Sequence, residues 1–235
     1  QFQAHMKNLE LYSEGFPQAG SVKLDSDVPA LEETADVLEL MLQFMHHTRQ
    51  PDLSEVSFTL LSSLAEAVEK YMIYSAMDIC KVLSIEEHPL DVLVYAQKHD
   101  YTKLANKAAP LTIAMNSKEV VAKANAARLY DSFIVTWFRY RDDHVDAARP
   151  ILRNAPVAPI LHKGGYEDCG LWATFAQAVR LASVDVDCLR PKDIENIMQA
   201  QSASLMGCMY CSKRADNWKR QAAVAQANIP AFCKV

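Results

Sequence analysis

The sequence predicts a mainly α-helical protein of the α+β class, with a small sheet near its start and an all-helical remainder. Apolar residues recur every three or four positions along most of the chain, which is the period of an amphipathic helix. Half of the 235 residues are hydrophobic and only 6 are glycine, a composition typical of a globular, helix-rich protein. Segments that resemble strands occur only close to the amino terminus.

The first predicted elements are a strand end and a short helix. Residues 2–5 are expected to end a strand and to lead into a helix that carries Leu9 and Phe16. Residues 22–24 are expected to form a second short strand. The next helix presents one apolar face, made by Val37, Leu40, Met41, Phe44 and Met45.

Helices are predicted to follow one another along the rest of the chain. A polar connection closed by Pro51 precedes a helix with Leu61 and Val68 on one face, and another helix follows Tyr74. Pro89 suits the first turn of the next helix, because the N–H that proline lacks has no intrahelical partner there.

A long helix is predicted to begin after Ser117 and to run towards Pro150, either unbroken or broken once. Its predicted apolar face carries Tyr130, Phe133, Ile134 and Trp137. Residues 150–170 are rich in proline and glycine, which favours a loop and a domain boundary. We therefore predict three regions, at residues 1–85, 86–150 and 151–235.

Three stretches of the first 110 or so residues carry a resemblance to a known family. The first is the entry pattern of Phe2, Ala4, His5, Leu9, Ser13 and Phe16. The others are residues 37–45 and the helical hairpin at residues 64–80. Together they resemble the BTB/POZ interaction domain, entered part-way through its second strand. Residues 49–53 are similar to the subset of that family found in mushroom-forming fungi.

The resemblance implies a truncated BTB/POZ-like unit at residues 1–85 that binds other proteins. Relatives dimerise through the first strand, which this chain lacks, and some recruit a cullin ubiquitin-ligase scaffold. A second copy of the chain or a cullin scaffold is therefore the implied partner. The expected interaction surface comprises Leu9, Leu11, Tyr12, Phe16, His46 and His47. Because the chain begins with Gln1 rather than Met, we also expect it to be a fragment.

Charge and cysteine usage exclude several other classes. The net charge of -5 argues against a nucleic-acid binder, whose domains are usually basic. No stretch approaches the roughly 18 apolar residues of a membrane span. The six cysteines are interpreted as reduced thiols, since a chain of this size does not need disulfides. We therefore expect a cytoplasmic or nuclear protein.

Cys208 and Cys211 form a pair with the spacing of metal ligands. Two thiolates at this spacing supply half of a tetrahedral zinc site. The candidates for the other ligands are Cys169, Cys188, Cys233 and His162. Since no second close pair exists, we prefer the interpretation that these are buried thiols packed beside Trp218, and we expect no cofactor.

The sequence favours a non-enzymatic protein. Cys169 lies near Trp172 in a pattern that partly matches papain-type proteases, but Leu171 occupies the position of the nucleophile and no histidine follows His162. We therefore expect a protein–protein interaction module. The alternative is a zinc-stabilised helical domain with a Cys208/Cys211 site and unknown activity. A degenerate gene product with no current role is a third interpretation.

Overall fold

The computed structural model is mostly helical and divides into two compact units, unit 1 (Gln1–Glu87) and unit 2 (His88–Val235). It describes residues 4–16, 31–80, 85–156, 160–162, 165–167, 169–185 and 190–235. The prediction of a mainly helical fold is confirmed. None of the described helices is long and apolar enough to cross a membrane.

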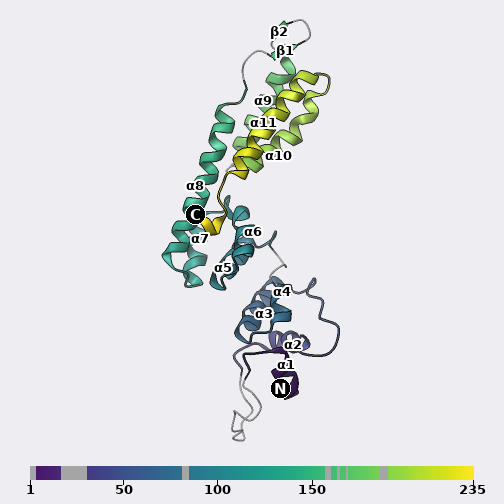
Figure 1. Cartoon of the computed structure of the whole chain (residues 1–235), viewed down its shortest axis with the longest axis vertical. Helices are drawn as coiled ribbons and strands as arrows, with labels where there is room; N and C mark the ends of the chain where they lie inside the picture. Colours follow the sequence, from purple (N-terminus) through teal and green to yellow (C-terminus); the bar gives the residue numbers. More distant parts are fainter. Residues whose placement is uncertain are drawn as a thin grey trace. The chain divides into compact units, whose positions relative to one another are not determined.

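Unit 1 contains four helices among its described residues (Figure 1). They are α1 (Met6–Tyr12), α2 (Ala35–Gln43), α3 (Phe58–Lys70) and α4 (Tyr74–Cys80). Helices α2 and α4 both pack against α3. The buried side chains include Val37, Met41, Phe44, Met45, Leu61, Leu64, Val68 and Ile73. The apolar faces predicted for α2 and α3 therefore supply much of this core.

The chain after α1 is fastened to the end of α3. The N–H of Gly15 donates to the carbonyl oxygen of Tyr71 at 3.0 Å, and the hydroxyl of Ser13 donates to the same oxygen at 2.5 Å. The ring of Phe16 stacks on that of Tyr71 with centroids 4.4 Å apart. A Cβ atom at Gly15 would lie 2.6 Å from the Cα of Tyr71, so only glycine fits this approach.

The small sheet predicted for residues 1–85 is not seen in the described part of unit 1, which corrects that prediction. Ala4 and His5 lie outside any strand, and His5 is the N-cap of α1. Residues 2, 3 and 22–24, on which the other strand predictions rest, lie outside the described residues. A strand needs a neighbour to pair its backbone groups, and the described residues of unit 1 supply none.

Unit 2 contains the remaining helices and one β-hairpin. Its elements are α5 (Pro89–Lys98), α6 (Thr102–Thr112), α7 (Ser117–Ala126), α8 (Asp131–Arg153), β1 (Ile160–His162), β2 (Gly165–Glu167), α9 (Gly170–Asp185), α10 (Pro191–Gln201), η1 (Ser202–Leu205), α11 (Met209–Ala227) and η2 (Phe232–Lys234). The two strands pair antiparallel, with His162 opposite Gly165. The sequence predicted only a loop for this segment.

The helix predicted from Ser117 to Pro150 is two helices, α7 and α8. The break includes Arg128, whose φ of +57° lies in the left-handed region. Tyr130 is 85% exposed, so its assignment to the apolar face was wrong. It is the N-cap of α8 and therefore lies before the first residue of the helix. Trp137 is fully buried, and its indole N–H donates to the hydroxyl of Thr112 at 2.9 Å. Helix α8 continues past Pro150, so the predicted division after residue 150 falls inside it.

Helix α8 joins two packed groups within unit 2 (Figure 1). Its first half contacts α7 and η2, where Phe232 packs edge-on against Tyr140 with centroids 5.3 Å apart. Its second half contacts α10 and α11. In this second group the indole N–H of Trp218 donates to the carbonyl oxygen of Ile151 at 3.1 Å. The side chains Trp172, Phe175, Val179, Ile194, Met198, Trp218 and Ala222 form a continuous core there.

Candidate metal centre

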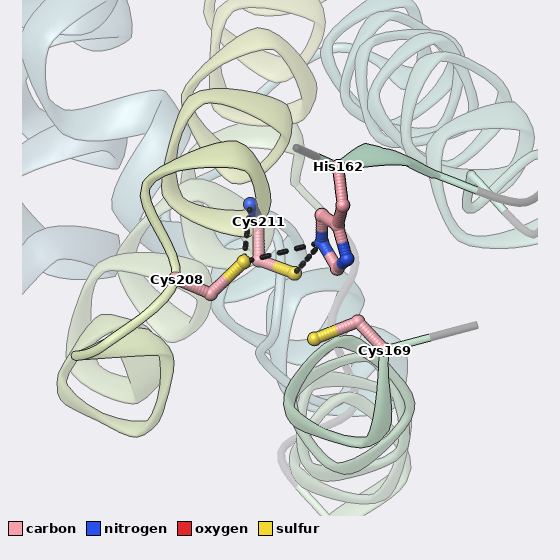
Figure 2. A group of neighbouring side chains, drawn as sticks. All are labelled: His162, Cys169, Cys208 and Cys211. Carbon is pink, nitrogen blue, oxygen red and sulfur yellow. Dashed lines mark hydrogen bonds between the residues drawn. The ribbon is translucent and has the colours of Figure 1, made fainter. Parts of the chain in front are cut away.

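Four side chains of unit 2 bring metal-binding atoms together at one place (Figure 2). They are His162, Cys169, Cys208 and Cys211, and their ligand atoms all lie within 4.8 Å of one another. They come from three elements: the end of β1, the residue before α9, and the start of α11. The group could hold a metal ion.

The start of α11 supplies two of the four side chains. Cys208 is the N-cap of the helix, and its sulfur accepts the backbone N–H of Cys211 at 3.4 Å. Residues three apart lie on the same side of a helical turn. Cys169 stands immediately before α9, and its carbonyl oxygen accepts the N–H groups of Trp172 and Ala173 at 3.0 and 3.2 Å. Local helix-start geometry therefore orients all three thiols.

The hairpin supplies the imidazole. The Nε2 atom of His162 lies 3.3 Å from the sulfur of Cys208 and 4.0 Å from that of Cys211. The ring also contacts that of Tyr210, with centroids 5.3 Å apart. On the paired strand Gly165 has a φ of +144°, a conformation that L side chains rarely adopt. The glycine therefore suits the position opposite His162 in the antiparallel pair.

These distances fit a tetrahedral metal site. Zinc–sulfur and zinc–nitrogen bonds of about 2.3 and 2.0 Å place neighbouring ligand atoms about 3.5–3.8 Å apart at tetrahedral angles. The two distances from the imidazole of His162 to the sulfurs, 3.3 and 4.0 Å, bracket that range. Cys211 is buried and the other three side chains are partly buried. Little rearrangement separates this geometry from that of a ligated centre.

The two cysteines of α11 differ in acidity. The backbone N–H of Cys211 stabilises the thiolate of Cys208 and lowers the pKa of that thiol to about 7. Burial, followed by the neighbouring Cys208, raises the pKa of Cys211 to about 12. Of the two thiols, Cys208 is therefore the one that ionises more readily. Cys211 would ionise only with a bound cation, whose charge deprotonates a coordinating thiol.

The core of unit 2 lies directly behind the cluster. Cys211 is part of the same buried group as Trp172 and Trp218, and Cys169 and Cys208 pack against that group. The indole N–H of Trp172 also donates to the carbonyl oxygen of Pro156 at 2.7 Å, which ties α9 to the segment before the hairpin. The centre therefore lies at the edge of an aromatic core rather than on an isolated loop.

The structure brings three of the five candidate cysteines, Cys169, Cys208 and Cys211, together with the candidate histidine. Cys188 lies outside the described residues. Cys233 is exposed and lies elsewhere in unit 2, with its sulfur 3.8 Å from the carbonyl oxygen of Thr102. The preferred interpretation, thiols packed beside Trp218, identified the surroundings of Cys211. It missed the convergence of Cys169 and His162 on the same point.

The residues predicted to form an interaction surface lie in unit 1. The hydroxyl of Tyr12 is 3.0 Å from the ring nitrogens of His47, and the amide of Asn8 is 3.3 Å from the Nδ1 of His46. Leu11 is 65% exposed. The other two predicted residues, Leu9 and Phe16, are half-buried. Helix α1 and the histidine pair are thus neighbours, while Phe16 packs on Tyr71.

A comparison with protein-family models, curated proteins and solved structures finds no match to this chain. The resemblance to the BTB/POZ domain therefore stays a prediction. The case for a function rests on the geometry of the two units.

Proposed function

We propose that unit 2 is a helical domain stabilised by a structural zinc ion, and that the protein binds other proteins rather than catalysing a reaction. The observation that carries this proposal is the Cys₃His cluster, in which the chain itself offers four ligand atoms. Structural zinc sites have four protein ligands, whereas catalytic sites keep one position open for water or substrate. The complete ligand set favours a structural role.

The chemistry of the donors selects zinc among common metals. Calcium and magnesium prefer oxygen ligands, and the cluster contains none. Thiolates with one imidazole in a tetrahedral arrangement suit zinc.

The ligands would connect parts of the chain that are far apart in sequence. His162 is separated by 46 residues from Cys208 and by 49 from Cys211. Bound zinc would cross-link β1, α9 and α11, and structural zinc contributes on the order of 10 kcal/mol to the folding of small domains. The hairpin would gain most, because an isolated two-stranded hairpin is marginally stable in water.

Metal analysis of the purified full chain tests this proposal. We expect one zinc per chain after expression in zinc-supplemented medium, and loss of that zinc in Cys208→Ser and Cys211→Ser. Cys233→Ser is the matched control, because that exposed thiol lies outside the cluster and should not affect zinc content. A wild-type chain that contains no metal, and whose thermal unfolding is unchanged by added zinc or chelator, would overturn the proposal.

For unit 1 we propose a protein-binding role, with a second copy of the chain as the first candidate partner. The supporting observation is the exposed Leu11 on α1, the helix that also places Tyr12 beside His47. Aromatic side chains such as that of Tyr12 are enriched in the buried centres of protein interfaces, which are more apolar than the rest of the surface. The BTB/POZ resemblance implies either a second copy or a cullin scaffold.

Light scattering over a range of concentrations tests this second role. The wild-type chain should approach the mass of two chains, and Leu11→Asp should remain at the mass of one. Val224→Asp, at an exposed position of α11, is the control and should behave as wild type. A single-chain mass at every concentration, together with no binding to a purified cullin scaffold, would contradict the role of unit 1.

A further inference from the structure

Arg214 is a half-buried cation placed one helical turn after Cys211 on α11. Its guanidinium carbon lies 4.6 Å from the centroid of the Trp172 ring, which is a cation–π arrangement. Its Nη1 atom is buried and has no hydrogen-bond partner among the described residues. An unpaired buried donor on a charged group is costly, so this position calls for a compensating interaction.

Trp172 links Arg214 to the other two elements of the cluster. It lies three residues after Cys169 on α9, just as Arg214 lies three residues after Cys211 on α11. Its indole N–H holds the carbonyl oxygen of Pro156, in the segment that leads to β1 and His162. The pair of Arg214 and Trp172 thus connects α9 with α11, and Trp172 also binds the chain just after α8.

The charge of Arg214 also complements the ligand set. Three thiolates and a neutral imidazole around a divalent cation leave a net charge of about -1. Burial lowers the pKa of Arg214, and the nearby Cys211, once ionised, opposes this effect. Arginine nonetheless stays protonated in proteins. A positive charge one turn from Cys211 therefore offsets the excess negative charge of a ligated centre.

We infer that Arg214 is a positioning residue of the metal centre, which aligns α9 with α11 through Trp172 and balances the charge of the thiolates. This inference rests on the zinc binding proposed above. Groups that act on the ligands of a metal, rather than on the ion itself, typically contribute 10- to 100-fold to metal affinity.

Competition with a chromophoric zinc chelator, at fixed pH and ionic strength, tests the inference on the full chain. We expect Arg214→Met, which keeps an unbranched apolar stem but removes the guanidinium with its charge and its contact with Trp172, to weaken zinc binding about 10- to 100-fold at unchanged stoichiometry. Arg214→Lys restores the charge without the planar stacking, and we expect partial recovery of affinity. Arg220→Met, on the same helix and with its guanidinium hydrogen-bonded to Asn217, should bind zinc as wild type does.

Cobalt substitution supplies a second readout. The thiolate-to-cobalt absorption of Arg214→Met should show the same three thiolates but saturate at higher cobalt concentration. Equal zinc affinity in Arg214→Met and wild type would overturn the inference while leaving zinc binding intact. Equal losses in Arg214→Met and Arg214→Lys would overturn the charge role. If the wild-type chain binds no zinc at all, the proposed zinc domain fails first, so the two failures are distinguishable.

Discussion

The two units of this protein are stabilised in different ways. The described core of unit 1 is built from aliphatic, methionine and phenylalanine side chains on three helices, such as Met41, Phe44 and Leu64. The second group of unit 2 adds a cluster of metal-binding atoms to an aromatic core around Trp172 and Trp218. The described residues of unit 1 contain no such cluster and are held by this packing together with the hydrogen bonds to Tyr71. Unit 2 would gain a further contribution from a bound metal ion, which can be removed without changing the sequence.

Removal of zinc should give the largest difference between the units. Treatment with a chelator should increase hydrogen exchange in β1 and at the starts of α9 and α11, because these segments lose their cross-link. Helices α2 and α3 of unit 1 should keep their protection. The free energy of unfolding of unit 2 should fall by several kcal/mol. This is less than the value on the order of 10 kcal/mol that applies where zinc is the main source of folding energy.

Exchange measured by mass spectrometry, with and without chelator, checks this expectation. Cys208→Ser without chelator should reproduce the pattern. Equal deprotection of both units would show that the cluster does not act locally.

A cavity in the core of unit 1 should give the reverse pattern. Leu64 is fully buried on α3, and Leu64→Ala should destabilise unit 1 by about 2–5 kcal/mol, since it removes apolar contacts and leaves a void. Zinc affinity should not change. Hydrogen exchange of α2 and α3 reports the first effect, and chelator competition reports the second. A variant that lost zinc affinity would mean that the two units are energetically coupled.

Acid should weaken unit 2 through His144. This side chain is fully buried on α8, and neither ring nitrogen has a hydrogen-bond partner among the described residues. Burial, then the charge of Arg190, lowers its pKa to about 4, although Asp193 opposes the shift. The edge-on ring of Tyr140 packs against it. The unfolded chain therefore binds the proton more readily than the folded one.

The stability contributed by neutral His144 is complete above pH 6.5 and is lost as the pH falls from about 6.5 to 4. The loss is at most about 3.4 kcal/mol, at 1.36 kcal/mol for each pH unit between 6.5 and about 4. His144→Leu should remove this part of the pH dependence. Chemical denaturation of both proteins from pH 4 to 8, at equal zinc, measures it. If stability falls with pH in the same way in both proteins, the assignment of this pH dependence to His144 is contradicted.

The smallest expected effects come from matched helix caps, one in each unit. The hydroxyl of Ser57 accepts the N–H of Leu60 at the start of α3, and the amide oxygen of Asn116 accepts the N–H of Lys118 at the start of α7. Ser57→Ala should cost unit 1 about 1 kcal/mol, and Asn116→Ala should cost unit 2 a similar amount. Denaturant titrations monitored by hydrogen exchange assign each loss of stability to its unit. A loss in the opposite unit would again indicate coupling.

Local patterns in the sequence predicted the helices and much of their buried faces. Val37, Met41 and Phe44 recur with the helical period, and all three are buried. Tyr130 was misplaced because the period was extended across the break at residues 127–130. That break depends on the backbone conformation of Arg128, which hydrophobic spacing does not encode. The hairpin was missed for a similar reason, since its three-residue strands are too short for a periodic signal.

The sequence by itself determined that the chain is mainly helical, where many of the apolar faces lie, and that Cys208 and Cys211 form a pair with the spacing of metal ligands, because these properties depend on neighbours within a few residues. Only the tertiary structure decided that Cys169 and His162 close the ligand set and that Arg214 stacks on Trp172. These residues lie on different elements, and His162 is 46 positions from Cys208. Their convergence is fixed by how α8, α9 and α11 pack around a common core, which no local pattern records.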